Sequence, residues 1–233
     1  MSKEKKNKNE KGTLFIVATP IGNLEDITLR AIRVLSEVDI IAAEDTRRAK
    51  ILLSKYDINT PTTSFFSAHQ KRKAPLLINR LLSGDNVALI TEAGTPGVSD
   101  PGSYLASIAR ENDIEVIPLP GPSALAAAIS VAGLNKAVFT FFGFLAPKGS
   151  KRNKALNKIA QLDHPAVLYE SPHRLSRTLK DIFDRAGDRK LIVAREMTKI
   201  HEEIYKTTIE EAIEKYEKVA PRGEFTLIIG EKT

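Results

Sequence analysis

The sequence predicts an α/β protein with two α/β domains, an N-terminal one built on a parallel sheet and a C-terminal one built on a mixed sheet. Three observations predict this class. Short apolar strands alternate with amphipathic helices through the first half of the chain. The proline-rich stretch Pro118–Pro122 then interrupts the alternation. In the second half, residues 203–207 alternate in polarity, as an antiparallel strand does.

The N-terminal domain is expected to span residues 13–120, after a disordered basic tail over residues 1–12 (MSKEKKNKNEKG). Its helices carry apolar residues at helical spacing, and Asp26 and Asp45 are placed to cap two of them. The five strands expected to form its sheet cover residues 13–18, 40–43, 62–66, 87–90 and 114–118. A strand–helix alternation of this kind is typical of a parallel sheet, whose carboxyl ends all meet at one edge.

The C-terminal domain is expected to span residues 121–233. It begins with a helix from Ser123 that consists almost entirely of small residues, and a basic helix follows Gly149. Further helices are expected after Pro172 and from Ile209. Strands are expected at residues 138–142, 166–169, 191–194, 203–207 and 225–229.

Composition excludes several classes of function. The chain has 233 residues, a net charge of +6, four histidines and no cysteine, so disulfides and thiolate chemistry are excluded and no metal site is expected. No apolar run approaches the ~20 residues that span a bilayer. The polar N-terminus does not resemble a secretory signal. A cytoplasmic protein without a membrane segment is therefore expected.

The most distinctive stretch is residues 91–102, TEAGTPGVSDPG, which directly follows the apolar strand at residues 87–90. Its three glycines and two prolines favour a fixed backbone shape that a ligand can approach closely. A rigid strand-to-helix turn without a ligand is the alternative. Asp100, just before Pro101, is expected to cap the helix that follows.

Polar loops, most of them rich in Gly or Pro, recur at the ends of other expected strands. If the two domains direct these strand ends at one cleft, the loops converge on a small-molecule site there. The loops concerned cover residues 19–23, 44–47, 92–102, 120–124, 170–174 and 195–199. The chain contains no GxxxxGK[ST], GxGxxG, GxSxG or HExxH motif, so these loops indicate a site but no reaction.

A resemblance supplies the reaction. In chain order, the segments TPIGNLEDITLRA, AEDTRR, ITEAGTPGVSDPG, IPLPGPSAL, GFLAPK, YESPHRL, AREMTKIHEE and RGEFTLIIG are similar to motifs of the tetrapyrrole methylase superfamily. Within it, the chain resembles the branch of bacterial small-subunit (16S) ribosomal RNA ribose 2′-O-methyltransferases. The resemblance covers nearly all of the chain after the tail.

The resemblance implies S-adenosylmethionine bound in a cleft between two α/β domains, a homodimer, and methylation of a cytidine ribose 2′-hydroxyl in the decoding region. It also implies that particular positions contact the cofactor. These are Pro20, Ala93, Gly94, Thr95, Val98, Ser123, Ala124, Glu170 and Met197.

Two sequence features bear on the choice of branch. Relatives often carry Asp where this chain has Glu92, which leaves a direct carboxylate contact there open. Tetrapyrrole-modifying members carry GxGPG after the first strand, whereas this chain has TPIGNL, which favours the RNA branch. A tetrapyrrole C-methyltransferase and a non-catalytic ribosome-binding module are the alternatives.

Charged residues supply the remaining candidates. A ribose hydroxyl is a poor nucleophile, so Glu196, Lys199 and Arg195 are predicted as catalytic residues, a structural Arg195–Glu196 ion pair being the alternative. Basic clusters that could neutralise phosphates include Lys71-Arg72-Lys73 and the helix near Lys151. The residues predicted to contact RNA are Arg47, Arg48, Lys151, Arg152, Lys154 and Arg174.

Overall fold

The computed structural model describes residues 10–135 and 138–232, and the chain divides into two compact units. Unit 1 ends at Ser123 and unit 2 begins at Ala124, close to the boundary expected after Pro120. In the part of the chain so described, no helix has both the length and the apolar character needed to cross a membrane.

Unit 1 contains a five-stranded, fully parallel sheet in the order β3-β2-β4-β1-β5. Because all five strands are parallel, the loops that follow them emerge at one edge of the sheet. The strands are β1 (Leu14–Val17), β2 (Ile40–Ala43), β3 (Thr62–Ser64), β4 (Val87–Ile90) and β5 (Val116–Leu119). The parallel N-terminal sheet predicted from the sequence is confirmed.

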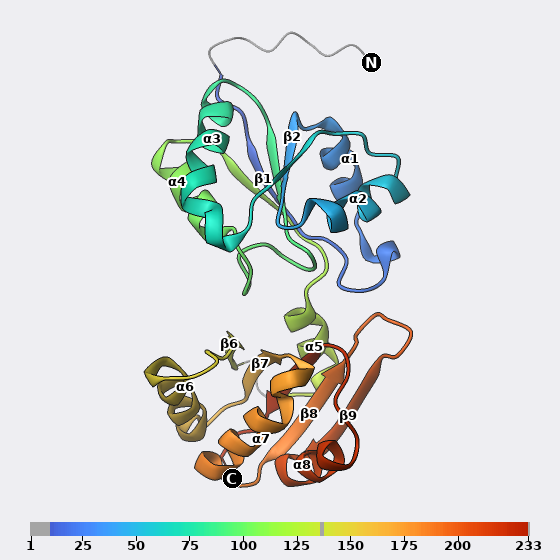
Figure 1. Cartoon of the computed structure of the whole chain (residues 1–233), viewed down its shortest axis with the longest axis vertical. Coiled ribbons are helices and arrows are strands. Elements are labelled where there is room, and N and C mark those ends of the chain that lie inside the picture. The colour runs from blue at the N-terminus through green and yellow to red at the C-terminus, as the bar shows by residue number, and fades with distance from the viewer. Residues whose placement is uncertain (1–9, 136–137, 233) are drawn as a thin grey trace. The chain divides into compact units, whose positions relative to one another are not determined.

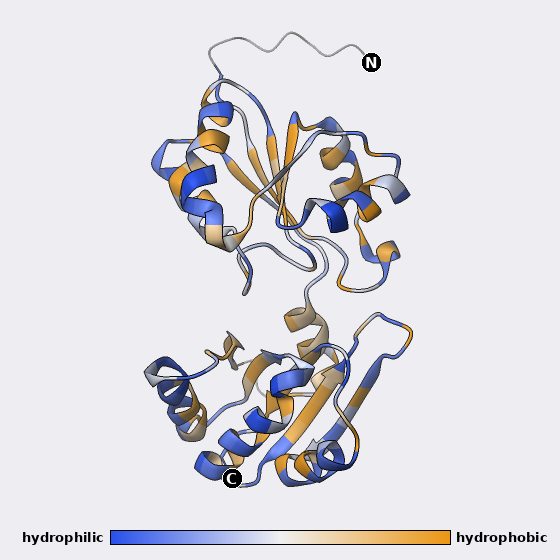
Figure 2. Ribbon diagram, viewed as in Figure 1, coloured by the Kyte–Doolittle hydropathy of each residue, from blue (hydrophilic) through white to orange (hydrophobic). Residues whose placement is uncertain are grey.

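Helices cover both faces of this sheet (Figure 1). Helices α1 (Leu29–Glu37) and α2 (Thr46–Lys55) share one hydrophobic cluster with the sheet, and α3 (Gln70–Leu82) and α4 (Ser103–Glu111) share another. Strands β2 and β4 are therefore buried on both faces, which explains why they are continuous apolar runs rather than alternating ones (Figure 2).

Unit 2 contains a mixed five-stranded sheet in the order β6-β7-β10-β8-β9. Only β6 and β7 pair in parallel, and the other pairs are antiparallel, as the sequence predicted for a mixed sheet. The strands are β6 (Thr140–Phe144), β7 (Ala166–Glu170), β8 (Lys190–Arg195), β9 (Glu203–Thr208) and β10 (Phe225–Ile229).

The helices of unit 2 belong to two groups. Helices α6 (Ser150–Gln161), α7 (Pro172–Ala186) and α8 (Ile209–Lys218) form one core with the sheet. Helix α5 (Ala124–Ala132), the helix of small residues, packs against β10, and its Leu125 backbone N–H donates to the Tyr169 hydroxyl at 2.9 Å.

Three local predictions were wrong. The expected tail ends earlier than residue 12, since the backbone N–H of Gly12 donates to the Leu81 carbonyl at 2.7 Å; residues 1–9 of that tail lie outside the described residues. Thr28 rather than Asp26 caps α1. Asp100 does not cap α4, because the N-cap position is Gly102, with φ 148°. The Asp45 cap of α2 is confirmed.

Candidate functional site

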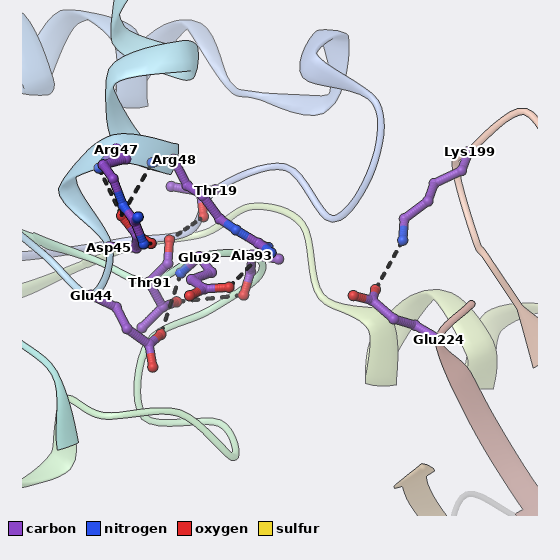
Figure 3. A network of polar contacts seen from close by, with 10 residues as sticks. All are labelled: Thr19, Glu44, Asp45, Arg47, Arg48, Thr91, Glu92, Ala93, Lys199 and Glu224. Carbon is purple, nitrogen blue, oxygen red and sulfur yellow. Dashed lines mark hydrogen bonds and ion pairs between the residues drawn. The ribbon is translucent and has the colours of Figure 1, made fainter. Parts of the chain in front are cut away.

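Three loops at the carboxyl edge of the unit 1 sheet are hydrogen-bonded to one another. Thr19 and Gly94 exchange two backbone hydrogen bonds of 2.9 Å each, which join the loop after β1 to the loop after β4. The Thr19 hydroxyl donates to the Thr91 carbonyl at 3.2 Å (Figure 3). The Thr95 hydroxyl donates to the Pro122 carbonyl at 3.1 Å, which adds the loop after β5. Three of the loops expected to line a site are thus joined to one another within unit 1.

Two glycines allow this close approach. Gly94 has φ 77°, a left-handed conformation that side chains with a Cβ rarely adopt. A Cβ at Gly121 would lie 2.9 Å from the Cβ of Ala18, so only glycine lets the loop after β5 pass the end of β1. The backbone around Pro20 and residues 93–95 is therefore held in one shape by hydrogen bonds between the loops.

Three carboxyl groups gather at the same edge, after β2 and β4. Partial burial and the neighbouring charges of Glu44 and Glu92 raise the pKa of Asp100 to about 6. Burial also raises the pKa of Glu44, whose carboxylate accepts the Glu92 backbone N–H at 3.4 Å. This edge therefore carries negative charge that its own cations do not fully compensate, an environment that favours a cationic ligand.

The two arginines predicted to contact RNA in this region have partners of their own. Arg48 pairs with Glu92 at 2.9 Å, and Arg47 pairs with Asp45 at 3.0 Å (Figure 3). The hydrogen bonds from Arg47 lower the pKa of Asp45 to about 2. Both guanidinium groups are largely exposed, with side-chain exposures of 90% for Arg47 and 64% for Arg48, so phosphate oxygens could still reach them.

The raised pKa of Asp100 predicts how the free energy of unfolding depends on pH. Since its pKa is about 6 in the folded protein and 3.8 as a free group, the folded state binds the proton more tightly than the unfolded state. Stability from this group is fully present below pH 3.8 and is lost as the pH rises through about 6. We expect Asp100→Asn, which cannot ionise, to raise the free energy of unfolding by about 1 kcal/mol well above pH 6, allowing for solvent screening of this half-buried group.

Urea denaturation at several pH values measures this difference. It should shrink as the pH falls through about 6 and vanish below 3.8. Asp113→Asn is the control, because Asp113 lies in the same unit and its side chain is 94% exposed. A difference for Asp100→Asn that does not change with pH would contradict the assigned cause.

In unit 2, a small ion-pair cluster lies at the end of β8. The Lys199 ammonium contacts the Glu196 Oε1 at 2.8 Å and the Glu224 Oε2 at 3.1 Å, the latter drawn in Figure 3. The Glu196 Oε1 also accepts the Glu224 backbone N–H at 2.9 Å. Although partial burial opposes ionisation, these bonds lower the pKa of Glu196 and raise that of Lys199. The two groups are thus held as a carboxylate and an ammonium.

The two sequence neighbours of Glu196, Arg195 and Met197, have different surroundings. The suggested Arg195–Glu196 ion pair is not formed: Arg195 donates to the Arg222 carbonyl at 2.6 Å and lies 3.6 Å from the Glu203 carboxylate. Met197 is buried, with 8% exposure. Glu196 and Thr198 both have positive φ, at 50° and 66°, so the loop backbone is strained on either side of Met197.

A buried polar network crosses unit 2 beneath β7. The Glu170 carboxylate, which is 1% exposed, accepts the Thr178 hydroxyl at 2.6 Å and the Ser171 N–H at 2.8 Å. The Arg152 guanidinium donates to the same Thr178 hydroxyl at 3.0 Å and to Asp181 at 2.6 Å and 2.9 Å. This network ties β7, α6 and α7 together.

Two of the arginines predicted to contact RNA, Arg152 and Arg174, bond to members of this network. Arg152 is 3% exposed, so the prediction that it contacts RNA is wrong: its charge is already neutralised inside unit 2. Arg174 is partly exposed but pairs with Glu170 at 3.3 Å and donates to the Leu145 carbonyl. Lys151 and Lys154, in contrast, lie on the exposed side of α6 and have no ion-pair partner within residues 10–135 and 138–232.

Several residues that shape these loops were missed from the sequence. Thr19 and Gly121 join the unit 1 loops, and Gly223 lies against Glu196, where an added Cβ would be 2.4 Å from its Cγ. Glycine in a strand-end loop was the available signal, but sequence spacing does not say which side chain it makes room for. Among the described residues, no group of three or more His, Asp or Glu side chains is arranged to hold a metal ion.

The fold and these loops define a two-unit α/β protein whose first unit presents a set of interlinked, Gly- and Pro-rich loops at the carboxyl ends of parallel strands. The sequence profile of the Tetrapyrrole (Corrin/Porphyrin) Methylases matches residues 13–213. The chain belongs to the tetrapyrrole methylase family.

Relatives and solved structures agree with this assignment. A Thermotoga maritima protein named ribosomal RNA small subunit methyltransferase I is 45% identical over 221 residues, covering 95% of this chain and 99% of that protein. A Synechocystis protein of the same name is 45% identical over 223 residues, covering 95% and 80%. Two solved structures share the fold. The structure of a diphthine synthase has a TM-score of 0.76 at 14% identity and covers 95% of this chain and 91% of that one. The structure of Thermus thermophilus uroporphyrin-III C-methyl transferase complexed with S-adenyl homocysteine has a TM-score of 0.69 at 20% identity and covers 94% and 98%.

Proposed function

We propose that this protein transfers a methyl group from S-adenosylmethionine to the ribose 2′-hydroxyl of a cytidine in small-subunit (16S) ribosomal RNA. The observation that carries the proposal is the 45% identity to the Thermotoga protein, which extends over nearly the full length of both chains. The segment TPIGNL in place of GxGPG favours the RNA branch of the family. The ribose and the cytidine are what the resemblance to that branch implies.

The loops of unit 1 fit the methionine end of this cofactor. Their backbone around residues 93–95 turns at the left-handed Gly94, which pairs with Thr19 just before Pro20, and the Val98 N–H donates to the Thr95 carbonyl at 3.2 Å. The carboxyl groups of Glu44, Glu92 and Asp100 supply negative potential for a ligand that carries an ammonium and a sulfonium. When bound, the cofactor supplies an electrophilic methyl group on a positively charged sulfur.

The remaining predicted cofactor contacts stay part of the proposal in revised form. Ser123 and Ala124 lie at the start of α5 and are partly exposed. The Glu170 side chain is fully engaged with Thr178 and Ser171, so it acts by positioning the end of β7 and not as a direct ligand. Met197 is buried between two residues with positive φ, and the backbone of its loop is proposed to contact the adenosine side.

The Glu196–Lys199 cluster is proposed to act on the ribose hydroxyl. Because the pKa of Glu196 is lowered, its carboxylate is a weak proton acceptor, and its stronger effect is to orient the Lys199 ammonium. Lys199, with its raised pKa, stays protonated and stabilises the negative charge that develops on the 2′-oxygen as the hydroxyl proton passes to solvent water. Arg195 holds the neighbouring segment through the Arg222 carbonyl and Glu203.

The exposed lysines of α6 are proposed to contact RNA phosphates. We expect Lys151→Glu with Lys154→Glu to weaken binding of small ribosomal subunits by about tenfold, because phosphate contacts are lost, and to leave the affinity for S-adenosylmethionine unchanged. The salt dependence of subunit binding should also fall, since fewer phosphates are neutralised. Binding titrations at two salt concentrations measure this. Glu210→Lys, a charge change at an exposed position of α8 in the same unit, is the control. Equal loss of cofactor and subunit binding would show that the lysines serve the fold.

The test of the function is transfer of a labelled methyl group to small ribosomal subunits that lack the modification, followed by mapping of the 2′-O-methyl position. A uroporphyrinogen is the competing acceptor. Methylation of the tetrapyrrole and not of the particle would replace the proposal with the C-methyltransferase alternative. Cofactor binding without transfer to either would reject it, and absence of cofactor binding would favour the non-catalytic module.

Two further properties belong to the same proposal. Ribosomal RNA as the substrate implies that the protein acts in the cytoplasm. We also propose a homodimer, as the resemblance implies, which light scattering at several concentrations tests directly: a mass of one chain, 25.7 kDa, at all concentrations would reject it.

A further inference from the structure

A pair of exposed rings lies where β3 ends in unit 1, outside the loops described above. The rings of Phe66 and His69 meet edge to face, with centroids 4.5 Å apart and an interplanar angle of 88°. Phe66 is 36% exposed, whereas its neighbour Phe65 is 0% exposed and belongs to the core. Phe65 therefore supplies the aromatic side chain that this segment contributes to the core, and core packing does not explain the exposed ring of Phe66.

Positively charged residues follow this ring pair directly along the chain. Lys71 and Arg72 are exposed in the first turn of α3, and neither has an ion-pair partner in the part of the chain that the structure describes. Lys73 donates to the Ser64 hydroxyl at 3.0 Å, which fixes the start of the helix to β3. The sequence contains no Asp or Glu anywhere from residue 58 to residue 84.

This arrangement is electrostatically unfavourable for the helix itself. Cations in the first turn oppose the helix dipole, which favours anions there by about 0.3–1 kcal/mol for each charge. No acidic residue in that turn offsets them. Exposed aromatic rings beside uncompensated cations are instead the combination that binds single-stranded nucleic acid, where bases stack on the rings and phosphates meet the charges.

We propose that these residues form a platform that stacks an unpaired nucleotide of the RNA substrate. The platform consists of Phe66, His69, Lys71 and Arg72. This proposal rests on the proposed function and specifies its substrate further, as a single-stranded segment of RNA. Strand β3 is two strands away from β4 in the sheet, about 10 Å, so one RNA strand can contact both the platform and the edge that carries the proposed cofactor loop.

Binding of a labelled single-stranded oligocytidylate to the full-length protein, measured by fluorescence anisotropy, tests the platform. We expect Phe66→Ala to weaken binding about five- to 150-fold, the range that base stacking on one ring supplies, and Phe66→Tyr to retain it. Leu76→Ala is the matched control, because Leu76 is 62% exposed on α3 of the same unit and is not aromatic. S-adenosylmethionine affinity and thermal unfolding should match the unmodified protein in all three variants.

Charge reversal tests the second half of the platform. Lys71→Glu with Arg72→Glu should weaken binding of the single strand and reduce its salt dependence, whereas Arg110→Glu, an exposed position on α4, should not. A duplex of the same length should lose less affinity on Phe66→Ala, since its bases are not free to stack.

Several results would overturn the platform. These are unchanged binding by Phe66→Ala, equal losses for Phe66→Ala and Phe66→Tyr, or equal losses for single strand and duplex. A variant that binds the oligonucleotide normally but methylates ribosomal subunits poorly would show a protein-docking surface instead. Failure of the unmodified protein to methylate any particle would reject the proposed function, while the oligonucleotide titrations would still decide on the platform.

Discussion

Replacing Arg152 with alanine is expected to lower the free energy of unfolding by about 3 kcal/mol, because it breaks a buried ion pair and leaves its partners without a donor. Arg152 is 3% exposed and donates to Asp181, to the Thr178 hydroxyl and to a backbone carbonyl. Without the guanidinium, the Asp181 carboxylate loses its main partner. The Thr178 hydroxyl keeps only Glu170 as an acceptor.

The neighbouring residue supplies a matched control. Lys151 lies one position earlier on α6 and is exposed, so Lys151→Ala should change the free energy of unfolding by no more than about 0.5 kcal/mol. Arg152→Lys keeps the charge but loses the planar fork, and we expect an intermediate value. Urea denaturation followed by circular dichroism measures all three. Equal stabilities for Arg152→Ala and Lys151→Ala would show that the buried pair contributes nothing.

The same residue shows where sequence reasoning failed. Arg152, Leu156 and Ile159 are spaced four and three residues apart, so they share the buried face of α6. The prediction counted Arg152 with its basic neighbours as an RNA-contacting residue and did not weigh the face of the helix on which it lies. What the sequence could not show was the acceptor, Asp181, which α7 brings from 29 residues away.

Sequence predictions were most accurate where burial determines the pattern. The strands at residues 87–90 and 225–229 match β4 and β10 residue for residue, since both are fully buried and, apart from Thr226, apolar. They were least accurate where backbone conformation decides. The Asp100-Pro101 pair has the sequence of a helix start, yet α4 begins only at Ser103, because Gly102 adopts φ 148°, outside the helical range.

The arginine at the end of β8 illustrates a third limit. Arg195 and Glu196 are adjacent in sequence, but β8 ends at Arg195 and Glu196 adopts φ 50°, so the chain leaves the strand direction between the two side chains. Arg195 instead lies opposite Glu203 in the β8–β9 register, a pairing that depends on how the two strands align. The candidate site could thus be located from sequence as a set of loops, whereas its pairings required the sheet.

Gly223 offers a way to test the candidate catalytic cluster without changing any charge. A Cβ at this position would lie 2.4 Å from the Cγ and 2.7 Å from the Oε1 of Glu196. Gly223→Ala should therefore push the Glu196 carboxylate away from Lys199 and from the Glu224 N–H. We expect methyl transfer to fall by about 100-fold, the lower end of what a positioned charged group supplies in a transition state, with cofactor affinity changed little.

Left-handed strain is the competing explanation, and the chain contains a control for it. Gly223 has φ 89°, and Gly187 in the same unit has φ 71° with no atom within 4 Å of an added Cβ. Gly187→Ala therefore introduces comparable backbone strain, about 1 kcal/mol, without displacing a side chain. Single-turnover methylation of ribosomal subunits should be slow for Gly223→Ala and for Glu196→Gln but normal for Gly187→Ala. Normal rates for Glu196→Gln would remove Glu196 from the mechanism, and equal losses in both glycine variants would assign the effect to the backbone.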